Sequence, residues 1–205
     1  KKMNVIFGPP GTGKTHKLLT IVEEGLDKGI EPNEIGYFAY TRKAANEAIT
    51  RAVDRFPQYD KKDFKYFRTL HSLAYMELGL TDSSLMDDDD YTEVSDKLKV
   101  KLSNPTNKYD NYGIGWQDDQ FVKIIDLARI KDVSLEHQFN QPETGHLPGG
   151  FLKLHKIASG LEKYKFQNGF LDFTDMILEF IKRKKAPKLR LLIIDEAQDL
   201  STIQW

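Results

Sequence analysis

The chain has 205 residues, a formal net charge of −1 and 40% hydrophobic residues, which is enough for one sizeable folded core. It contains no cysteine, so disulfides and thiolate metal sites are excluded, and a reducing compartment such as the cytoplasm fits. No apolar run approaches the roughly 20 residues of a membrane span, so we expect no membrane segment. The net charge gives no sign of nucleic acid, and any DNA-binding surface would have to be a local groove.

The first part of the chain alternates short apolar runs with helical patterns. The apolar runs that resemble strands are "MNVIF" (3–7), "EIGYFAY" (34–40) and "FKYFRT" (64–69). The helical patterns between and after them are 14–29, 42–56 and 70–80, the first with a glycine stop at Gly29. This alternation predicts an α/β fold with a parallel sheet flanked by helices.

The alternation stops at about residue 82 and resumes at about residue 166. Residues 82–165 combine turn-rich stretches with helical ones, and we interpret them as an inserted, mostly helical subdomain. Within it we expect the acidic run Asp87–Asp90 to be a solvated loop. The aromatic residues of this region are expected to pack in a core rather than to stack bases; they are Tyr112, Trp116 and Phe121.

The last stretch returns to a helix followed by a strand. "DFTDMILEFIKRK" is typical of a helix with Asp172 as N-cap and basic residues in its last turn, and "RLLIIDE" (190–196) of a strand. A basic cluster surrounds this junction: Lys182, Arg183, Lys184, Lys185, Lys188 and Arg190. This cluster leads into the start of the strand, away from the carboxyl ends of the strands, where ligands bind in such folds. We therefore expect it to improve solubility and to complement the dipole of the preceding helix.

The segment "GPPGTGKT" matches the phosphate-binding pattern G-x-x-x-x-G-K-[ST], between a predicted strand and a predicted helix. Its glycines let backbone N–H groups turn toward phosphate oxygens, and the helix N-terminus adds a favourable dipole. Lys14 would bridge the β- and γ-phosphates of ATP, and the Thr15 hydroxyl would ligate Mg²⁺. The residues that would hold the nucleotide are Gly8, Pro9, Pro10, Gly11, Thr12, Gly13, Lys14 and Thr15. The alternative is a glycine-rich turn that merely connects strand and helix.

A pair of acids ends the last apolar run, in "LLIIDE". Adjacent buried acids without a cation would be costly, so the pair calls for an ion or an exposed strand end. Beside the phosphate loop, Asp195 is expected to hold Mg²⁺ and Glu196 to act as general base toward the attacking water. The alternative is that both acids simply emerge into solvent.

Four segments together resemble the superfamily 1 DNA helicases of the UvrD/PcrA/Rep type. "DEAQD" (195–199) resembles their motif II, "FAYTRKAANEA" (38–48) motif Ia and "TLHSLAY" (69–75) motif Ib. "FLDFTDMI" (170–177) is similar to the acidic-aromatic segment that these helicases carry before motif II. The insertion at 82–165 falls where the family carries an accessory DNA-binding subdomain.

The resemblance implies roles for matching positions. Residues 1–81 and 166–205 would form a P-loop NTPase domain of RecA-like fold that binds ATP and Mg²⁺. Gln198 would sense the γ-phosphate, and His16 takes a position near the nucleotide that is often held by Arg. Single-stranded DNA would run along Thr41, Arg42, Lys43, Thr69, His71 and Ser72, because hydroxyls, cations and helix starts suit backbone phosphates.

The implied function is that of an ATP-dependent DNA helicase or translocase acting on single-stranded DNA with 3′→5′ polarity, in a process such as repair or replication. The family's second RecA-like domain, which supplies arginine fingers, does not follow within these residues. We therefore expect the 205 residues alone to be a monomer that binds nucleotide with Mg²⁺ but turns it over very slowly. Three alternatives stay open: a 5′→3′ relative, another P-loop ATPase, and a nucleotide-gated DNA-binding module. A downstream nuclease domain is also compatible with the sequence.

Overall fold

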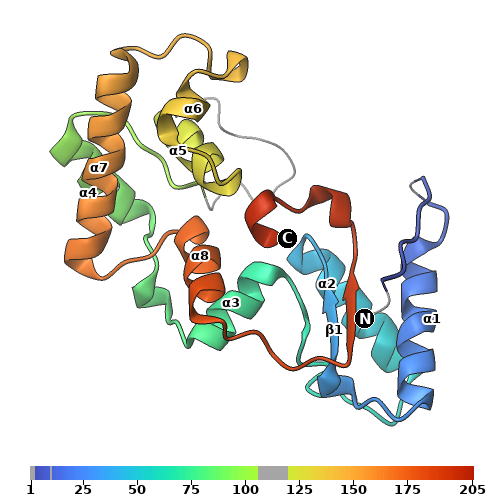
Figure 1. The fold of residues 1–205 in the computed structure, drawn as a ribbon. Coiled ribbons are helices and arrows are strands. Elements are labelled where there is room, and N and C mark those ends of the chain that lie inside the picture. Colours follow the sequence, from blue (N-terminus) through green and yellow to red (C-terminus); the bar gives the residue numbers. More distant parts are fainter. Residues whose placement is uncertain (1–2, 10, 106–119) are drawn as a thin grey trace. The chain divides into compact units, whose positions relative to one another are not determined.

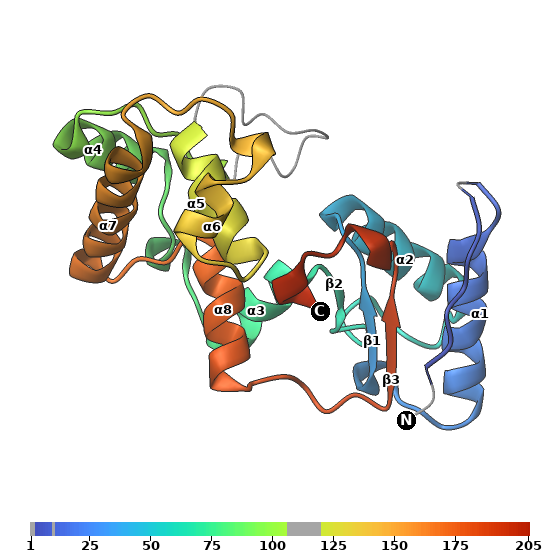
Figure 2. The same cartoon turned by 45° about the horizontal axis from the view of Figure 1, so that its top comes forward.

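The computed structural model describes residues 3–9, 11–105 and 120–205. The chain divides into two compact units, whose helices and strands are labelled in Figures 1 and 2. The first, which we call the sheet unit, comprises Lys1–Leu73 and Pro187–Leu200, and the second, the helical unit, comprises Ala74–Ala186 and Ser201–Trp205. The domain boundaries expected near residues 81 and 166 stay a prediction.

The sheet unit is built on three parallel strands in the order β2-β1-β3. The strands are β1 (Ile35–Phe38), β2 (Phe67–Arg68) and β3 (Leu191–Ile194). In the central strand, Tyr37 lies beside Phe67 of β2 on one side and Ile193 of β3 on the other. The expected parallel sheet flanked by helices is confirmed, although β2 keeps only two residues of the predicted run 64–69.

Two helices cover one face of this sheet (Figure 2). They are α1 (Lys14–Asp27) and α2 (Arg42–Arg55). The shared core joins Val22 of α1 to a row of alanines on α2 and to the odd-numbered side chains of β1 and β3. Small alanines at Ala45, Ala48 and Ala52 let α2 approach the strands closely, and burial of this apolar face stabilises the unit.

The predicted first strand, residues 3–7, is wrong in this structure. These residues take no regular secondary structure, and the side chains of Val5 and Phe7 are 63% and 91% exposed. An apolar run becomes a strand only when a neighbouring edge accepts its hydrogen bonds, and the described sheet ends at β3. The run therefore indicated strand propensity without determining a partner.

The helical unit is formed mainly by helices that pack around α7. Its helices are α3 from residue 74 onward (Leu70–Leu78 in full), α4 (Asp88–Leu98), α5 (Gln120–Ile130), α6 (Leu135–Phe139), α7 (Gly150–Asn168) and α8 (Phe173–Arg183). The described residues of the whole chain also form short 3₁₀ turns: η1 (Pro32–Glu34), η2 (Asp82–Ser84), η5 (Pro142–Thr144), η6 (Ala197–Asp199) and η7 (Thr202–Gln204). Among the described residues, no helix is both long and apolar enough to cross a membrane.

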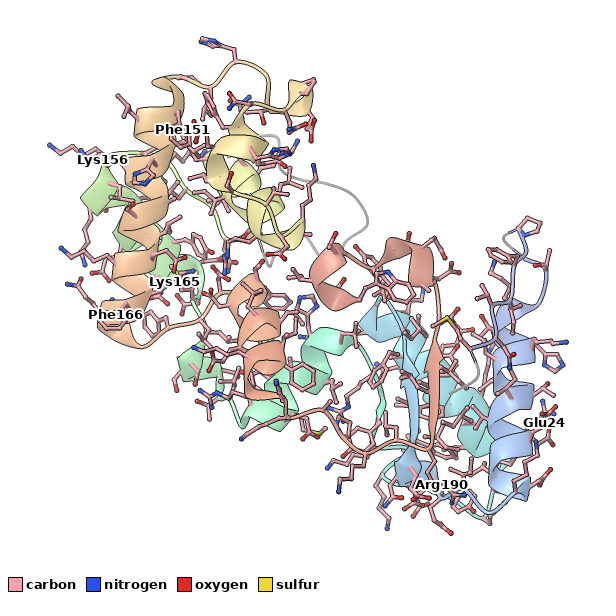
Figure 3. All side chains as sticks on the ribbon, viewed as in Figure 1. Glu24, Phe151, Lys156, Lys165, Phe166 and Arg190 are labelled. Carbon is pink, nitrogen blue, oxygen red and sulfur yellow. The ribbon has the colours of Figure 1, made fainter. Side chains whose placement is uncertain are left out.

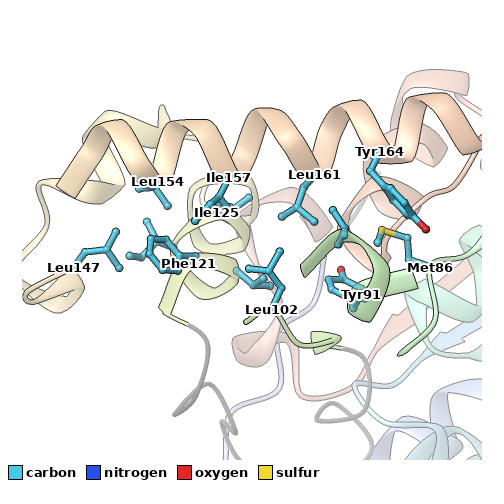
Figure 4. Packing of buried hydrophobic residues seen from close by; sticks show 13 residues of the cluster. Met86, Tyr91, Leu102, Phe121, Ile125, Leu147, Leu154, Ile157, Leu161 and Tyr164 are labelled. Atoms are coloured by element: carbon cyan, nitrogen blue, oxygen red, sulfur yellow. The ribbon is translucent and has the colours of Figure 1, made fainter. Parts of the chain in front are cut away.

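The core of the helical unit follows one stripe of α7. Leu154, Ile157, Leu161 and Tyr164 recur at helical spacing and face α4 and α5 (Figure 4). Phe121 of α5 lies in this core, which confirms its predicted packing role. Tyr112 and Trp116 lie outside the described residues.

The acidic run is not a loop, contrary to expectation, because it begins α4. The carboxylate of Asp87 accepts hydrogen bonds from the backbone N–H groups of Asp89 (2.9 Å) and Asp90 (3.0 Å). In turn, the carboxylate of Asp90 accepts a hydrogen bond from the backbone N–H of Asp87 at 3.0 Å. Acids in the first turn satisfy free N–H groups and favour the helix dipole, so the run initiates a helix. The predicted N-cap Asp172 of α8 is confirmed, since it accepts from the N–H of Asp175 at 2.7 Å.

A cluster of buried charges joins α5, α7 and α8. We call it the charge cluster; its members are Asp126, Arg129, Lys165, Asp172 and Asp175. Two guanidinium nitrogens of Arg129 donate hydrogen bonds to the two carboxylate oxygens of Asp172, at 2.7 and 3.1 Å. Arg129 also forms an ion pair with Asp175. Lys165 contacts one oxygen of Asp172 and one of Asp175, each at 2.7 Å.

The charge cluster contains three carboxylates but only two cations, and Asp126 is the least well paired. Its Oδ1 receives only two long contacts, from Arg129 and from the Thr174 hydroxyl, both at 3.4 Å. Burial, and then the negative charge of Asp172, raises the pKa of Asp126 to about 7. For Asp172, burial opposes ionisation, but the charges of Arg129 and Lys165 outweigh it and hold the pKa well below its ordinary value.

The raised pKa predicts a pH-dependent stability that Asp126→Asn removes. Between about pH 4 and pH 7 the folded protein holds a proton on Asp126 that the unfolded chain releases, so this group lowers stability as the pH rises. Asn keeps the shape without the charge. We expect the variant to gain roughly 2–4 kcal/mol relative to wild type between pH 4 and pH 8, measured by urea unfolding. Asp96→Asn, on the exposed side of α4, is the control. An equal pH profile for Asp126→Asn and wild type would contradict the assignment.

Candidate functional site

The glycine-rich loop precedes α1 and takes a conformation that its glycines permit. Gly11 and Gly13 both have φ of 79°, in the left-handed region that favours glycine. At Gly8, an added Cβ would lie 2.6 Å from the hydroxyl oxygen of Thr12, so a side chain there would require that hydroxyl to move. Pro10 lies outside the described residues. The loop backbone therefore favours glycine at Gly11 and Gly13.

The N-terminus of α1 has no side-chain cap. Gly13 is its N-cap residue, and its first turn carries no acid. The N–H groups at this end are consequently directed toward any group that approaches the loop, with the positive end of the helix dipole behind them. Thr15 is half-buried in the first turn and His16 is exposed.

Lys14 folds back over the loop. Its amino group donates hydrogen bonds to the carbonyl oxygens of Gly8 (2.9 Å) and Pro9 (3.2 Å). The Thr12 hydroxyl donates to the same Pro9 carbonyl at 2.8 Å. The site thus combines the ammonium group of Lys14, the uncapped N-terminus of α1 and the hydroxyl of Thr15. These groups fit a nucleotide phosphate accompanied by Mg²⁺.

The acid pair stands at the carboxyl end of β3. The N–H of Asp195 donates to the Phe38 carbonyl at 2.8 Å and so extends the pairing of β3 with β1. Asp195 is buried, at 8% exposure, whereas Glu196 is exposed and has a positive φ of 51°. This turn separates the two acids, one facing inward and one outward. Gln198, from the 3₁₀ turn η6, donates a hydrogen bond to Glu196.

Sequence reasoning missed the partner of the buried acid. The Tyr37 hydroxyl donates to Oδ2 of Asp195 at 2.7 Å. Burial, and then this hydrogen bond, raises the pKa of Tyr37 far above its ordinary value, so the hydroxyl keeps its proton. The pairing register of β1 with β3 would have revealed the contact, but a single sequence does not give that register.

The phosphate loop and the acid pair lie at the same end of the sheet unit (Figures 1 and 2). α1 packs beside β3, with Gly25 of α1 close to Leu191. Within the described residues no hydrogen bond or ion pair joins the loop directly to Asp195 or Glu196. By contrast, Arg190 lies where β3 begins (Figure 3), so this member of the basic cluster is remote from the site as predicted.

The residues expected to contact DNA follow β1 and β2 at this same carboxyl edge, because all three strands are parallel. Thr41 and Thr69 both act as helix caps. Thr41 accepts from the N–H of Ala44 and Thr69 from the N–H of Ser72, each at 3.1 Å. Their hydroxyl oxygens therefore already serve the starts of α2 and α3.

The remaining candidates differ in charge and exposure. Arg42 and Lys43 are exposed in the first turn of α2. Ser72 receives a long hydrogen bond from Arg68, at 3.3 Å to its hydroxyl. Burial, and then the positive charge of Arg42, lowers the pKa of His71 to about 4. His71 is consequently neutral near pH 7 and brings no cationic charge to this edge.

The surroundings of His71 predict how its titration responds to substitution. Because Arg42 contributes to the lowered pKa but burial contributes more, Arg42→Ala should raise the His71 pKa only part of the way from about 4 toward the ordinary value of a histidine. NMR titration of the His71 ring protons measures this. Lys43→Ala, the next residue along α2, is the matched control and should leave the pKa unchanged. An unchanged His71 pKa in Arg42→Ala would contradict this arrangement.

Fold and site together describe an α/β protein with a phosphate-type loop at a helix start and an acid pair at a strand end. The family model for the UvrD/REP helicase N-terminal domain matches residues 1–205. The chain therefore belongs to this family.

Two relatives from Mycoplasma pneumoniae are similar to the chain. A protein named "Probable DNA helicase" is 25% identical over 233 residues, covering 99% of this chain and 40% of that protein. A protein named "Probable DNA helicase II homolog" is 27% identical over 226 residues, covering 100% of this chain and 30% of that protein. The chain thus spans less than half the length of either relative.

Proposed function

We propose that the chain is the ATP-binding and hydrolysing part of a DNA helicase or translocase that moves 3′→5′ along single-stranded DNA. The sheet unit would serve as its RecA-like motor domain. One observation carries the proposal: the glycine-rich loop that ends at Gly13 leads into the uncapped N-terminus of α1, at the end of the sheet unit where β3 delivers Asp195. Family membership and the names of the two relatives support it.

In the proposed mechanism, ATP with Mg²⁺ supplies the phosphoryl group whose transfer to water drives movement. Lys14 exchanges its bonds to the Gly8 and Pro9 carbonyls for the phosphates, and the α1 dipole favours their negative charge. The Thr15 hydroxyl and Asp195 would hold the cation, which would offset the negative charge of the phosphates. The remaining nucleotide contacts come from the loop and from His16.

Glu196 and Gln198 have separate roles in this mechanism. Glu196 is exposed at the strand end and takes the proton of the attacking water. Gln198 already contacts Glu196, so a change at the γ-phosphate that moves one side chain also moves the other. We infer that this contact links the state of the nucleotide to the shape of the chain after β3.

Single-stranded DNA is proposed to follow the carboxyl edge of β1 and β2. Arg42 and Lys43 are exposed cations and would bind backbone phosphates. Thr41 and Thr69 act mainly by fixing the starts of α2 and α3, since their hydroxyls serve as caps. His71 and Ser72 would add neutral contacts. Such contacts are independent of base sequence, as a translocase requires.

The nucleotide site is tested by thermal unfolding. At a hundredfold excess over Kd, an ATP analogue with Mg²⁺ adds about 2.7 kcal/mol of stability, which raises Tm by about 5–10 °C for a chain of this size. Lys14→Ala should lose most of that rise, whereas Lys17→Ala, an exposed lysine one turn along α1, should retain it. The absence of a ligand-dependent rise in wild-type protein would contradict the proposal.

The DNA edge is tested by salt dependence. Replacing Arg42 and Lys43 by Ala removes two phosphate contacts, so the slope of log K against log salt for single-stranded DNA should become shallower by about 1.4. Fluorescence anisotropy with oligonucleotides of different sequence measures this, and the loss should be equal for each. Lys182 and Lys188, exposed members of the basic cluster, provide the matched double-alanine control. A greater loss in that control would place the DNA elsewhere.

A further inference from the structure

The contact between Tyr37 and Asp195 follows from strand register. Tyr37 is the direct neighbour of Ile193 across the β1–β3 pair. Asp195 lies two residues beyond Ile193, so its side chain is on the same face, one diagonal step away. A long aromatic side chain can span such a diagonal, and the terminal hydroxyl of Tyr, which Phe lacks, can donate a hydrogen bond there.

The ring of Tyr37 is held on its other side. It stacks on Phe67 of β2, with ring centroids 5.3 Å apart and planes inclined by 25°. Tyr37 itself is completely buried. The hydroxyl is therefore presented to Asp195 from a fixed position in the core.

Both carboxylate oxygens of Asp195 are engaged. Oδ2 accepts from the Tyr37 hydroxyl at 2.7 Å, and Oδ1 accepts from the N–H of Glu196 at 3.1 Å. Two donors on different oxygens fix the rotation of the carboxylate about its bond to Cβ. Each oxygen keeps a further lone pair with which it can accept from a metal-bound water or ligate a cation.

We propose that Tyr37 is a positioning residue for Asp195, fixing the carboxylate in the orientation in which it holds the Mg²⁺ that accompanies the nucleotide. This inference rests on the proposed function. Tyr37 does not touch the nucleotide or the cation; it acts through Asp195. Partners of this kind commonly change metal affinity by about 10- to 100-fold when they are removed.

The experiment compares nucleotide affinity with and without Mg²⁺. Titration calorimetry with a non-hydrolysable ATP analogue, in Mg²⁺ or in EDTA, gives the enhancement due to the metal. Tyr37→Phe keeps the ring and its stacking on Phe67 but removes the hydroxyl. We expect the enhancement to fall about tenfold, with the affinity in EDTA unchanged. Tyr59→Phe is the matched control, because Tyr59 packs against the same core cluster and lies edge-on to Phe64.

A double-mutant cycle separates positioning from a general structural effect. Asp195→Asn should lower the enhancement by itself, and adding Tyr37→Phe to it should lower the enhancement no further. Additive losses would overturn the inference, as would a normal enhancement in Tyr37→Phe. If Tyr37→Phe folds poorly, its affinity in EDTA falls as well. The ratio of the affinities in Mg²⁺ and in EDTA then decides the outcome, because incomplete folding lowers both equally: a fall in this ratio that is absent in the Asp195→Asn background supports positioning, and a fall that persists there overturns it.

The failure of the proposed function gives a different result. A wild-type protein whose nucleotide affinity does not respond to Mg²⁺ would overturn both proposals. A wild-type protein with a clear metal enhancement, which Tyr37→Phe leaves intact, would overturn only the role of Tyr37.

Discussion

The parallel pairing of β1 with both of its neighbours is the constraint on which the candidate site depends. Because all three strands run in the same direction, their carboxyl ends meet at one edge, and the chain places Thr41, Thr69 and Asp195 there. A slip of one residue between β1 and β3 would turn Asp195 to the other face and separate it from Tyr37. The buried hydrogen bond between them therefore favours the native register, and that register in turn makes the carboxylate available at the edge.

The helical unit is held together by a different kind of interaction. The apolar stripe on α7 stabilises the unit by burial, which is not directional. The charge cluster instead joins three helices through ion pairs between specific atoms. Buried ion pairs contribute little net stability compared with apolar packing, but breaking one partner is costly. The acids of "FLDFTDMI" belong to this cluster: Asp172 and Asp175 are engaged by Arg129 and Lys165. We infer that this segment sets where α8 begins, and that it serves structure rather than a ligand.

Local patterns in the sequence predicted the helices α1, α2, α3 and α8, the strands β1 and β3, the cap at Asp172 and the glycine-rich loop, because each depends on residues close together in the chain. The errors have the opposite character. The run at residues 3–7 has no neighbouring strand to pair with among the described residues, so it does not form a strand. The acidic run at Asp87–Asp90 begins a helix rather than a loop, because its carboxylates cap the first turn. Tyr37 is 158 residues from Asp195, and Arg129 is 43 residues from Asp172. Contacts of this kind depend on tertiary packing that no window of one sequence contains.

The charged groups of the candidate site are held by partners within the chain itself. Lys14 is bound to two loop carbonyls, Asp195 to Tyr37, and Glu196 to Gln198. A ligand must therefore exchange these bonds, and its affinity reflects the difference between old and new partners rather than the new contacts alone. The exchanges differ in cost. Lys14 gives up hydrogen bonds to neutral carbonyls in an exposed loop, which costs little free energy. Asp195 can keep its hydrogen bond from Tyr37 and still accept a further hydrogen bond from a metal-bound water. Under the proposed function, the loop would rearrange around phosphate while the acid stays fixed.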